Sequence, residues 1–110
     1  MCEQIENELI NVAMQIILHA GNARVKITEA LEKAKLFDFS SCESLVQEAE
    51  EEIHLAHKSQ TEIIQGEASG EHYEYSLLFA HAQDTLMTIN SEIRLSKQMI
   101  DILKLIKENK

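Results

Sequence analysis

The chain has 110 residues, which is the length of a single domain, so we treat residues 1–110 as one unit. It contains no Pro and only 3 Gly, which disfavours a turn-rich β-sandwich or barrel, and its 45% apolar content is too high for a disordered chain. The net charge of -9 would repel a phosphate backbone, and Trp is absent, so we expect no nucleic acid partner.

Two features of the sequence bear on the compartment. Cys2 and Cys42 are too few for a disulfide framework and are read as intracellular thiols. The first residues lack the basic and apolar regions of a signal peptide, and the longest apolar runs, such as residues 16–18, are far shorter than the roughly 20 residues of a membrane span. We therefore expect a cytoplasmic protein with no direct membrane insertion.

The first predicted helix covers about residues 3–36. Apolar side chains recur there at steps of three and four, which is the period of one helix face. The residues of this face are Ile5, Leu9, Val12, Ile16, Ala20, Ala23, Ile27, Ala30 and Ala34. Gly21-Asn22 interrupts the pattern, but we expect the helix to continue through it.

The second predicted helix covers about residues 41–66. It follows a break at residues 37–39, and we place Ser40 at its N-cap, with Glu43 reaching back to complete a capping box. Its apolar face consists of Cys42, Leu45, Ala49, Ile53, Ala56, Gln60 and Ile63. A second break is predicted from Gly66 to Gly70. Residues 41–74 carry nine acids and the single base Lys58, which is typical of a solvated helix face rather than of a docking surface.

The third predicted helix, about residues 73–107, has two stripes. The first contains Phe79, Ala82, Leu86, Ile89, Ile93, Ile100 and Leu103. The second contains Leu77, His81, Asp84, Thr88, Ser91, Leu95, Met99, Ile102 and Ile106. Because the other two helices can cover only one of these faces, the second stripe needs a partner chain. The expected fold is therefore an all-α, antiparallel three-helix bundle that forms a homo-oligomer.

Several histidines have spacings found in metal sites, but the sequence lacks the further ligands that such sites need. Glu51 and His54 form one Glu-x-x-His, half of a di-iron carboxylate site, but a second copy is missing. His54 and His57 share a helix face, yet two ligands make a weak metal site. His19 and His72 are read as structural residues.

His81 and Asp84 differ, because they lie on the partner-facing stripe where apolar residues would be expected. Ionisable groups at an interface are costly unless they are paired or functional. A neutral imidazole is also a good nucleophile toward phosphorus. Spacing alone leaves a structural role for this pair open.

Four separated motifs carry a resemblance to a known family. They are Ala20-Gly21-Asn22-Ala23-Arg24, then residues 56–61 (AHKSQT), residues 67–71 (EASGE) and residues 81–88 (HAQDTLMT). In this order and spacing the chain resembles the lactose/cellobiose class of enzyme IIA, a component of the bacterial phosphoenolpyruvate-dependent sugar phosphotransferase system.

The resemblance implies a three-helix bundle that assembles as a homotrimer and works as a phosphoryl carrier. HPr would pass its phosphoryl group to His81, which would pass it to a cysteine of enzyme IIB, while the membrane enzyme IIC takes up the sugar. Gln83 matches a polar neighbour of the phosphoryl site. Asp84 matches an aspartate that each subunit contributes to a divalent cation on the threefold axis, and oxygen ligands completed by water favour Mg²⁺ there.

One position departs from the family pattern, and other functions stay open. Many relatives carry a His directly after the Asp, where this chain has Thr85, so a second-histidine mechanism is in doubt. The alternatives are a histidine phosphotransfer domain of two-component signalling, whose motif expects Lys-Gly soon after the His, and a non-catalytic helical adaptor. The sugar, the effect of Thr85, the roles of His54 and His57 and the identity of the metal cannot be read from the sequence.

Overall fold

The computed structural model describes residues 2–73 and 75–109, with side chains from residue 8 onward. Three helices account for nearly all of this part of the chain: α1 (Cys2–Lys35), α2 (Phe39–Ala68) and α3 (Leu77–Glu108). No strand occurs in the described residues, which confirms the predicted all-α class. The expectations for the side chains of Cys2 and Ile5 lie outside what is described.

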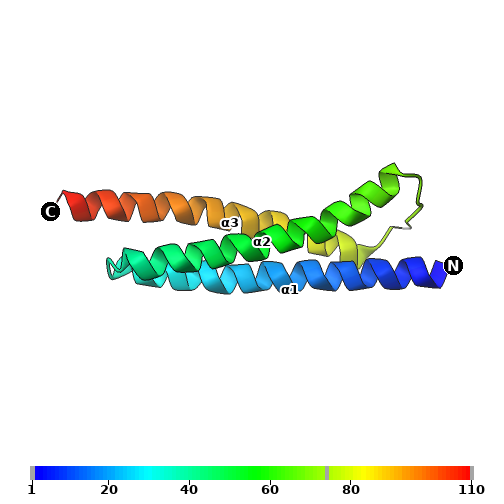
Figure 1. The fold of residues 1–110 in the computed structure, drawn as a ribbon, viewed down its shortest axis with the longest axis horizontal. Coiled ribbons are helices and arrows are strands. Elements are labelled where there is room, and N and C mark those ends of the chain that lie inside the picture. Colours follow the sequence, from blue (N-terminus) through cyan, green and yellow to red (C-terminus); the bar gives the residue numbers. More distant parts are fainter. Residues whose placement is uncertain (1, 74, 110) are drawn as a thin grey trace.

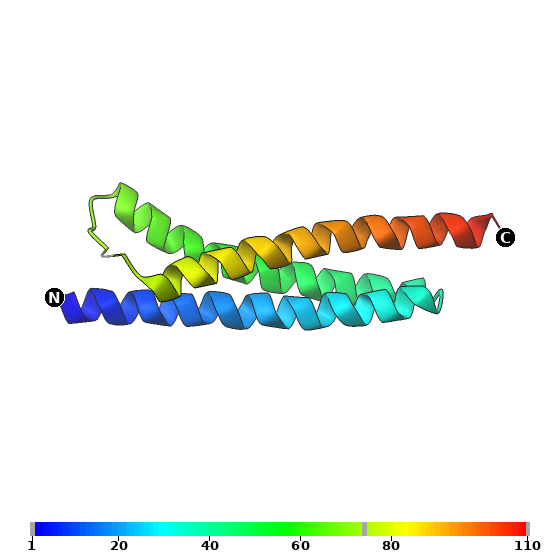
Figure 2. The ribbon, with the colours of Figure 1, turned by 180° about the vertical axis from the view of Figure 1, so that it is seen from behind.

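The helices form a long, staggered three-helix bundle. α1 and α3 run in one direction and α2 runs back in the other, so α2 is antiparallel to both (Figure 1). The C-terminal part of α3 extends past the turn that joins α1 to α2, while the end of α2 turns away from α1 at the opposite end of the bundle (Figures 1 and 2). This stagger gives the chain extents of 63 × 19 × 19 Å.

The core follows the predicted apolar faces and consists largely of small side chains. Eight alanines are fully buried on the three helices: Ala13, Ala20, Ala23, Ala30, Ala34, Ala49, Ala56 and Ala82. They let the helix axes approach closely, and larger residues such as Ile16, Leu86 and Ile89 fill the space between them. α1 passes through Gly21 without a break, as predicted.

The start of α2 differs from the predicted capping box. The helix begins at Phe39, and its N-cap is Asp38, whose carboxylate accepts a hydrogen bond from the Ser41 backbone N–H at 3.2 Å. Ser40 therefore lies inside the first turn and cannot cap. The reason is the preceding turn, in which Phe37 adopts φ 61° and the Asp38 N–H donates to the carbonyl of Lys33 at 3.0 Å. These two features form a Schellman motif that ends α1, and they place Asp38 directly before the first residue of α2.

The connection from α2 to α3 also differs from the prediction in its bounds. α2 runs past Gly66 to Ala68 and ends in a second Schellman motif, in which Gly70 has φ 102° and Glu71 N–H donates to the carbonyl of Gly66 at 3.0 Å. α3 begins at Leu77 rather than 73, because the Ser76 hydroxyl caps it by accepting from Phe79 N–H at 3.2 Å.

The two stripes of α3 separate as the sequence predicts. Ala82, Leu86, Ile89, Ile93 and Ile100 are buried, whereas Leu77, Leu95, Met99, Ile102 and Ile106 of the second stripe are exposed. A row of large apolar side chains along one helix is unusual for a free surface and is typical of a contact with another chain. The single chain thus leaves a whole face of α3 uncovered.

Candidate functional site

His81 lies in the second turn of α3, with its side chain exposed to solvent. The next residue, Ala82, and Leu86 one turn later are fully buried. They hold this part of the helix against the core that α1 and α2 form. The histidine is therefore presented on a rigid helix and not on a loop. A nucleophile held in this way can meet a reacting group without first ordering its own backbone.

The backbone carbonyl of His81 accepts a hydrogen bond from a side chain of its own helix. Thr85 donates a hydrogen bond from its hydroxyl to the carbonyl of His81 at 2.8 Å. This is the position at which the sequence departs from the family pattern, where many members have His. A threonine hydroxyl that bonds back to the carbonyl four residues earlier stays close to the helix. Thr85 therefore serves the backbone of His81 and does not supply a second imidazole.

The start of α3 favours negative charge close to His81. The first backbone N–H groups of a helix lack intrahelical partners and carry the positive end of the helix dipole. In α3, Ser76 satisfies the N–H of Phe79. Helical side chains tilt in general toward the N-terminus, and this first turn is the one that precedes His81.

Gln83 and Asp84 follow His81 but face different surroundings. Gln83 is half-buried, while Asp84 is exposed on the second stripe, three residues from His81. Within the described part of the single chain, no group of three His, Cys, Asp or Glu side chains could hold a metal ion. A cation site that includes Asp84 and two or more other side chains of these types would accordingly need ligands from further copies of the chain.

The orientation of α3 on α1 depends on an arginine from the first of the four motifs. Arg24 donates two hydrogen bonds to Glu92, from Nε at 2.9 Å and from Nη2 at 2.7 Å. This bidentate pair joins the middle of α1 to the middle of α3, and the bonds from Glu92 raise the pKa of Arg24. The motif residue is thus a link between helices in the single chain.

The other histidines fall into separate places. His19 on α1 lies 2.6 Å from a carboxylate oxygen of Glu52 on α2, which gives it the structural role expected of it. His72 is exposed in the connection between α2 and α3. His54 and His57 are exposed on α2, where they line a recess with Asn90 and Arg94 of α3 and not with His81.

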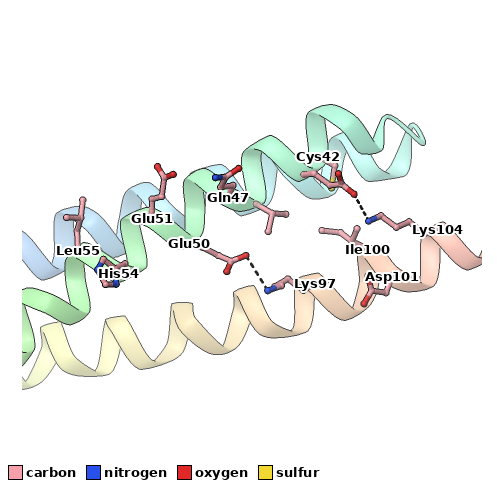
Figure 3. A pocket seen from close by; sticks show the side chains of 12 residues that line it. Cys42, Gln47, Glu50, Glu51, His54, Leu55, Lys97, Ile100, Asp101 and Lys104 are labelled. Atoms are coloured by element: carbon pink, nitrogen blue, oxygen red, sulfur yellow. Dashed lines mark hydrogen bonds and ion pairs between the residues drawn. The ribbon is translucent and has the colours of Figure 1, made fainter.

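A groove of about 730 Å³ separates α2 from α3 on the side of the bundle away from α1. Its walls carry the ion pairs Lys97–Glu50 at 3.2 Å and Lys104–Glu43 at 2.8 Å, and His54 points into the space between the helices (Figure 3). At one end lies Cys42, which is buried; the loss of solvent around it raises the pKa of its thiol. Burial and a raised pKa both oppose reactivity, so Cys42 is a packing residue.

Comparison with known proteins identifies the family. The family described as "PTS system, Lactose/Cellobiose specific IIA subunit" matches residues 11–104. The lichenan-specific phosphotransferase enzyme IIA component of Bacillus subtilis (strain 168) is 39% identical over 106 residues, which are 96% of each chain. The chain belongs to the lactose/cellobiose-specific IIA family of the sugar phosphotransferase system, whose members are phosphotransferase components.

Solved structures agree with this assignment. The cellobiose-specific enzyme IIA of Bacillus anthracis is 39% identical, with a TM-score of 0.86 over 91% of this chain and 92% of that one. A IIA(chitobiose) chain from a complex with HPr, from the N,N'-diacetylchitobiose branch of the Escherichia coli system, is 31% identical, with a TM-score of 0.79 over 90% of this chain and 96% of that one. The chain's family is thus that of IIA components and not that of histidine phosphotransfer domains.

One further property of the described residues concerns the membrane. None of the three helices has a stretch that is both long and apolar enough to cross a bilayer.

Proposed function

We propose that this protein carries a phosphoryl group on His81, which it accepts from phospho-HPr and passes to a cysteine of its cognate enzyme IIB. The observation that carries the proposal is the position of His81: an exposed imidazole on a rigid helix, inside the motif of a family of phosphotransferase components. Because HPr is bound to a structural relative in solution, HPr is the natural donor.

The chemistry needs little from the protein beyond placement. In the transfer, a lone pair on a ring nitrogen of His81 attacks phosphorus, the new P–N bond forms, and the bond from phosphorus to the donor breaks with its electron pair leaving on the donor. The remaining demand is to hold three negatively charged oxygens in line with donor and acceptor. The positive end of the α3 dipole lies in the turn that precedes His81, and it would contribute part of that stabilisation.

The exposed position of His81 suits a carrier. The group must be reached first by HPr and then by enzyme IIB, so it cannot lie in an enclosed pocket. Gln83, half-buried and two residues away, would hydrogen-bond to the phosphoryl oxygens or orient the imidazole. Since Thr85 bonds to the carbonyl of His81, this protein would transfer the group without a second histidine.

The assembled form would be a homotrimer in which the second stripe of α3 faces the threefold axis. The exposed side chains of Leu95, Met99 and Ile102 would then be buried between chains. Three copies of Asp84 would converge, and because like charges in a confined space repel, a divalent cation such as Mg²⁺ would neutralise them. The cation would hold the subunits together and take no part in the transfer.

The substrate of the complete system would be a β-linked disaccharide such as cellobiose or lactose. The relatives named above belong to systems for lichenan, cellobiose and diacetylchitobiose. The choice of sugar would rest with the membrane enzyme IIC, to which this protein contributes only indirectly through enzyme IIB.

The test is a reconstitution with phosphoenolpyruvate, enzyme I and HPr. We expect acid-labile phosphate on His81, located by mass spectrometry at alkaline pH, and none without HPr. Phosphate on another histidine would contradict the assignment of the site. No incorporation at all, with active HPr present, would contradict the carrier function.

A further inference from the structure

A second recess between α2 and α3 collects side chains that the phosphoryl site does not use. It has a volume of about 260 Å³ and lies at the level where His54 and His57 of α2 face Asn90 and Arg94 of α3. Lys97, Glu50, Ile53 and Ile93 complete its lining. His54 lies toward this end of the larger groove, and Lys97 lies nearer the middle, where it faces Glu50 (Figure 3).

The charge of this lining is opposite to that of the whole protein. The chain carries a net charge of -9, yet Arg94, Lys97 and two imidazoles surround the recess, with Glu50 as its one carboxylate. Glu50 is engaged by Lys97 at 3.2 Å. Arg94 forms no ion pair with any residue that the structure describes, so its planar set of donors is available to a ligand.

The donors fit an oxyanion better than a metal ion. Arg94, protonated imidazoles and the amide of Asn90 all donate hydrogen bonds, and arginine binds phosphate and sulfate oxygens through two parallel bonds. A cation would meet two imidazoles and a carboxylate, Glu50, that Lys97 already engages, beside an arginine and a lysine that repel it. No group of three side chains that could hold a metal ion occurs among the described residues. The volume also leaves space for a tetrahedral anion and a few waters, since a water occupies about 30 Å³.

We propose that this recess, which we call the α2–α3 anion site, binds a doubly charged oxyanion: inorganic phosphate or the phosphate of a small phosphate monoester. The inference is independent of the carrier function, because Asn90 lies nine residues beyond His81 and so about 14 Å further along α3. It gives the paired histidines of α2 a ligand that each alone could not hold.

Binding should depend on pH through the groups that face the recess. His54, His57 and Glu50 face it from α2, Arg94 and Lys97 face it from α3, and Glu51 and Asp101 line the adjoining groove. With both imidazoles neutral the lining carries one net positive charge, and with both protonated it carries three. Binding of an anion whose own charge stays constant over this range, such as sulfate, should accordingly strengthen as the pH falls from 8 to 5.5.

The experiment follows ¹⁵N resonances of the histidine rings and arginine Nε in the full chain during titration with sulfate, which stays a dianion over this pH range. We expect saturable shifts at His54, His57 and Arg94, with little change at His72, and tighter binding at pH 5.5 than at pH 8. Inorganic phosphate and glycerol phosphate form the second arm: binding of both indicates a monoester site, and binding of inorganic phosphate alone a site for the free ion.

Arg94→Gln is the decisive variant, with Lys33→Gln as its control. Both remove one positive charge at an exposed position, but Lys33 lies on α1 and does not line the recess. A hydrogen-bonded charge contributes about 1.5–3 kcal/mol, so Arg94→Gln should weaken sulfate binding about tenfold or more, while Lys33→Gln changes it less than twofold. A double variant, His54→Gln with His57→Gln, should abolish the pH dependence.

Three results would overturn the proposal. One is a shift of all histidines that grows linearly with sulfate and never saturates, which indicates screening alone. Another is an equal effect of Arg94→Gln and Lys33→Gln. The last is tight binding of Zn²⁺ at His54 and His57 in the absence of any sulfate binding, which would make the recess a metal site.

Discussion

Substitution of Leu95 by Glu tests whether the second stripe of α3 is an interface between chains. In the single chain 62% of Leu95 is exposed, so most of its apolar surface is available for burial by a partner. Fully burying a leucine contributes about 1.5–3 kcal/mol, so this fraction corresponds to about 1–2 kcal/mol per chain and about 3–6 kcal/mol for three copies. A carboxylate at the same place would also lose its water, which adds several kcal/mol in the same direction.

The expected result is dissociation of the assembly without unfolding of the chain. Sedimentation velocity should show wild type as a trimer at micromolar concentration and Leu95→Glu as a monomer, while circular dichroism shows the same helix content in both. The matched control is Leu55→Glu on α2, where the leucine is 42% exposed and lines the α2–α3 groove instead of the stripe. A monomeric wild type, or dissociation by Leu55→Glu with an intact Leu95→Glu trimer, would refute the assignment of the interface.

Three further predictions concern the axis and the two helix ends. A chelator should lower the melting temperature of the wild-type trimer, whereas Asp84→Leu should stay assembled and keep its melting temperature in the chelator. The reason is that replacing confined charges by apolar groups is often neutral or favourable by about 1–4 kcal/mol. A wild-type melting temperature that does not change with the chelator would contradict the axial cation. Glu71 accepts a hydrogen bond from the Tyr73 hydroxyl at 2.5 Å, which raises the pKa of Tyr73 to about 12. Both side chains lie against Gly66, where an added Cβ would stand 2.7 Å from an oxygen of each. Gly66→Ala should therefore lower the pKa of Tyr73 toward the ordinary tyrosine value in an ultraviolet titration, and an unchanged titration would show that the contact is not formed. Hydrogen bonding from the Ser41 side chain, and then from the Ser41 backbone N–H, lowers the pKa of Asp38. The contribution of Asp38 to stability is therefore present above the ordinary aspartate pKa of about 3.9 and is lost as the pH falls through the lowered value. The melting temperature of Asp38→Ala should lie below that of wild type at pH 7 and approach it at pH 3, and a constant difference would be inconsistent with the cap.

The helices could be predicted from the sequence because each buries one regular face. In each helix, buried apolar residues recur with the helical period, as around Ile16 in α1, Ile53 in α2 and Ile89 in α3. The same period shows that α3 has a second apolar face, which the single chain does not cover. The exposure of Leu95 in the single chain follows directly from that second stripe.

The helix ends could not be predicted equally well, because several residues compete for each cap. Asp38 and Ser40 both suit an N-cap, and the choice depends on the Schellman turn that Phe37 completes with a positive φ, which is uncommon for a residue other than Gly. In the same way Ser76 takes the cap of α3, four residues later than the periodic pattern alone suggests.

The candidate phosphoryl site was accessible to sequence reasoning, and the α2–α3 anion site was not. His81 stands within a contiguous motif, so its position needs no knowledge of how the helices meet. The recess depends on the stagger of α2 against α3, which brings His57 opposite Asn90, and no local pattern in either helix specifies that register. The only signal was the spacing of His54 and His57 on one face.

The most direct measurement of the central claim is a single-turnover transfer from phospho-HPr to this protein, with His81→Gln compared with His19→Gln, His54→Gln, His57→Gln and His72→Gln. We expect His81→Gln to accept no phosphoryl group while it keeps its helix content and assembly, and the other four variants to accept the group at close to the wild-type extent. Full phosphorylation of His81→Gln, or its loss in one of the other variants with His81 intact and the fold preserved, would contradict the account.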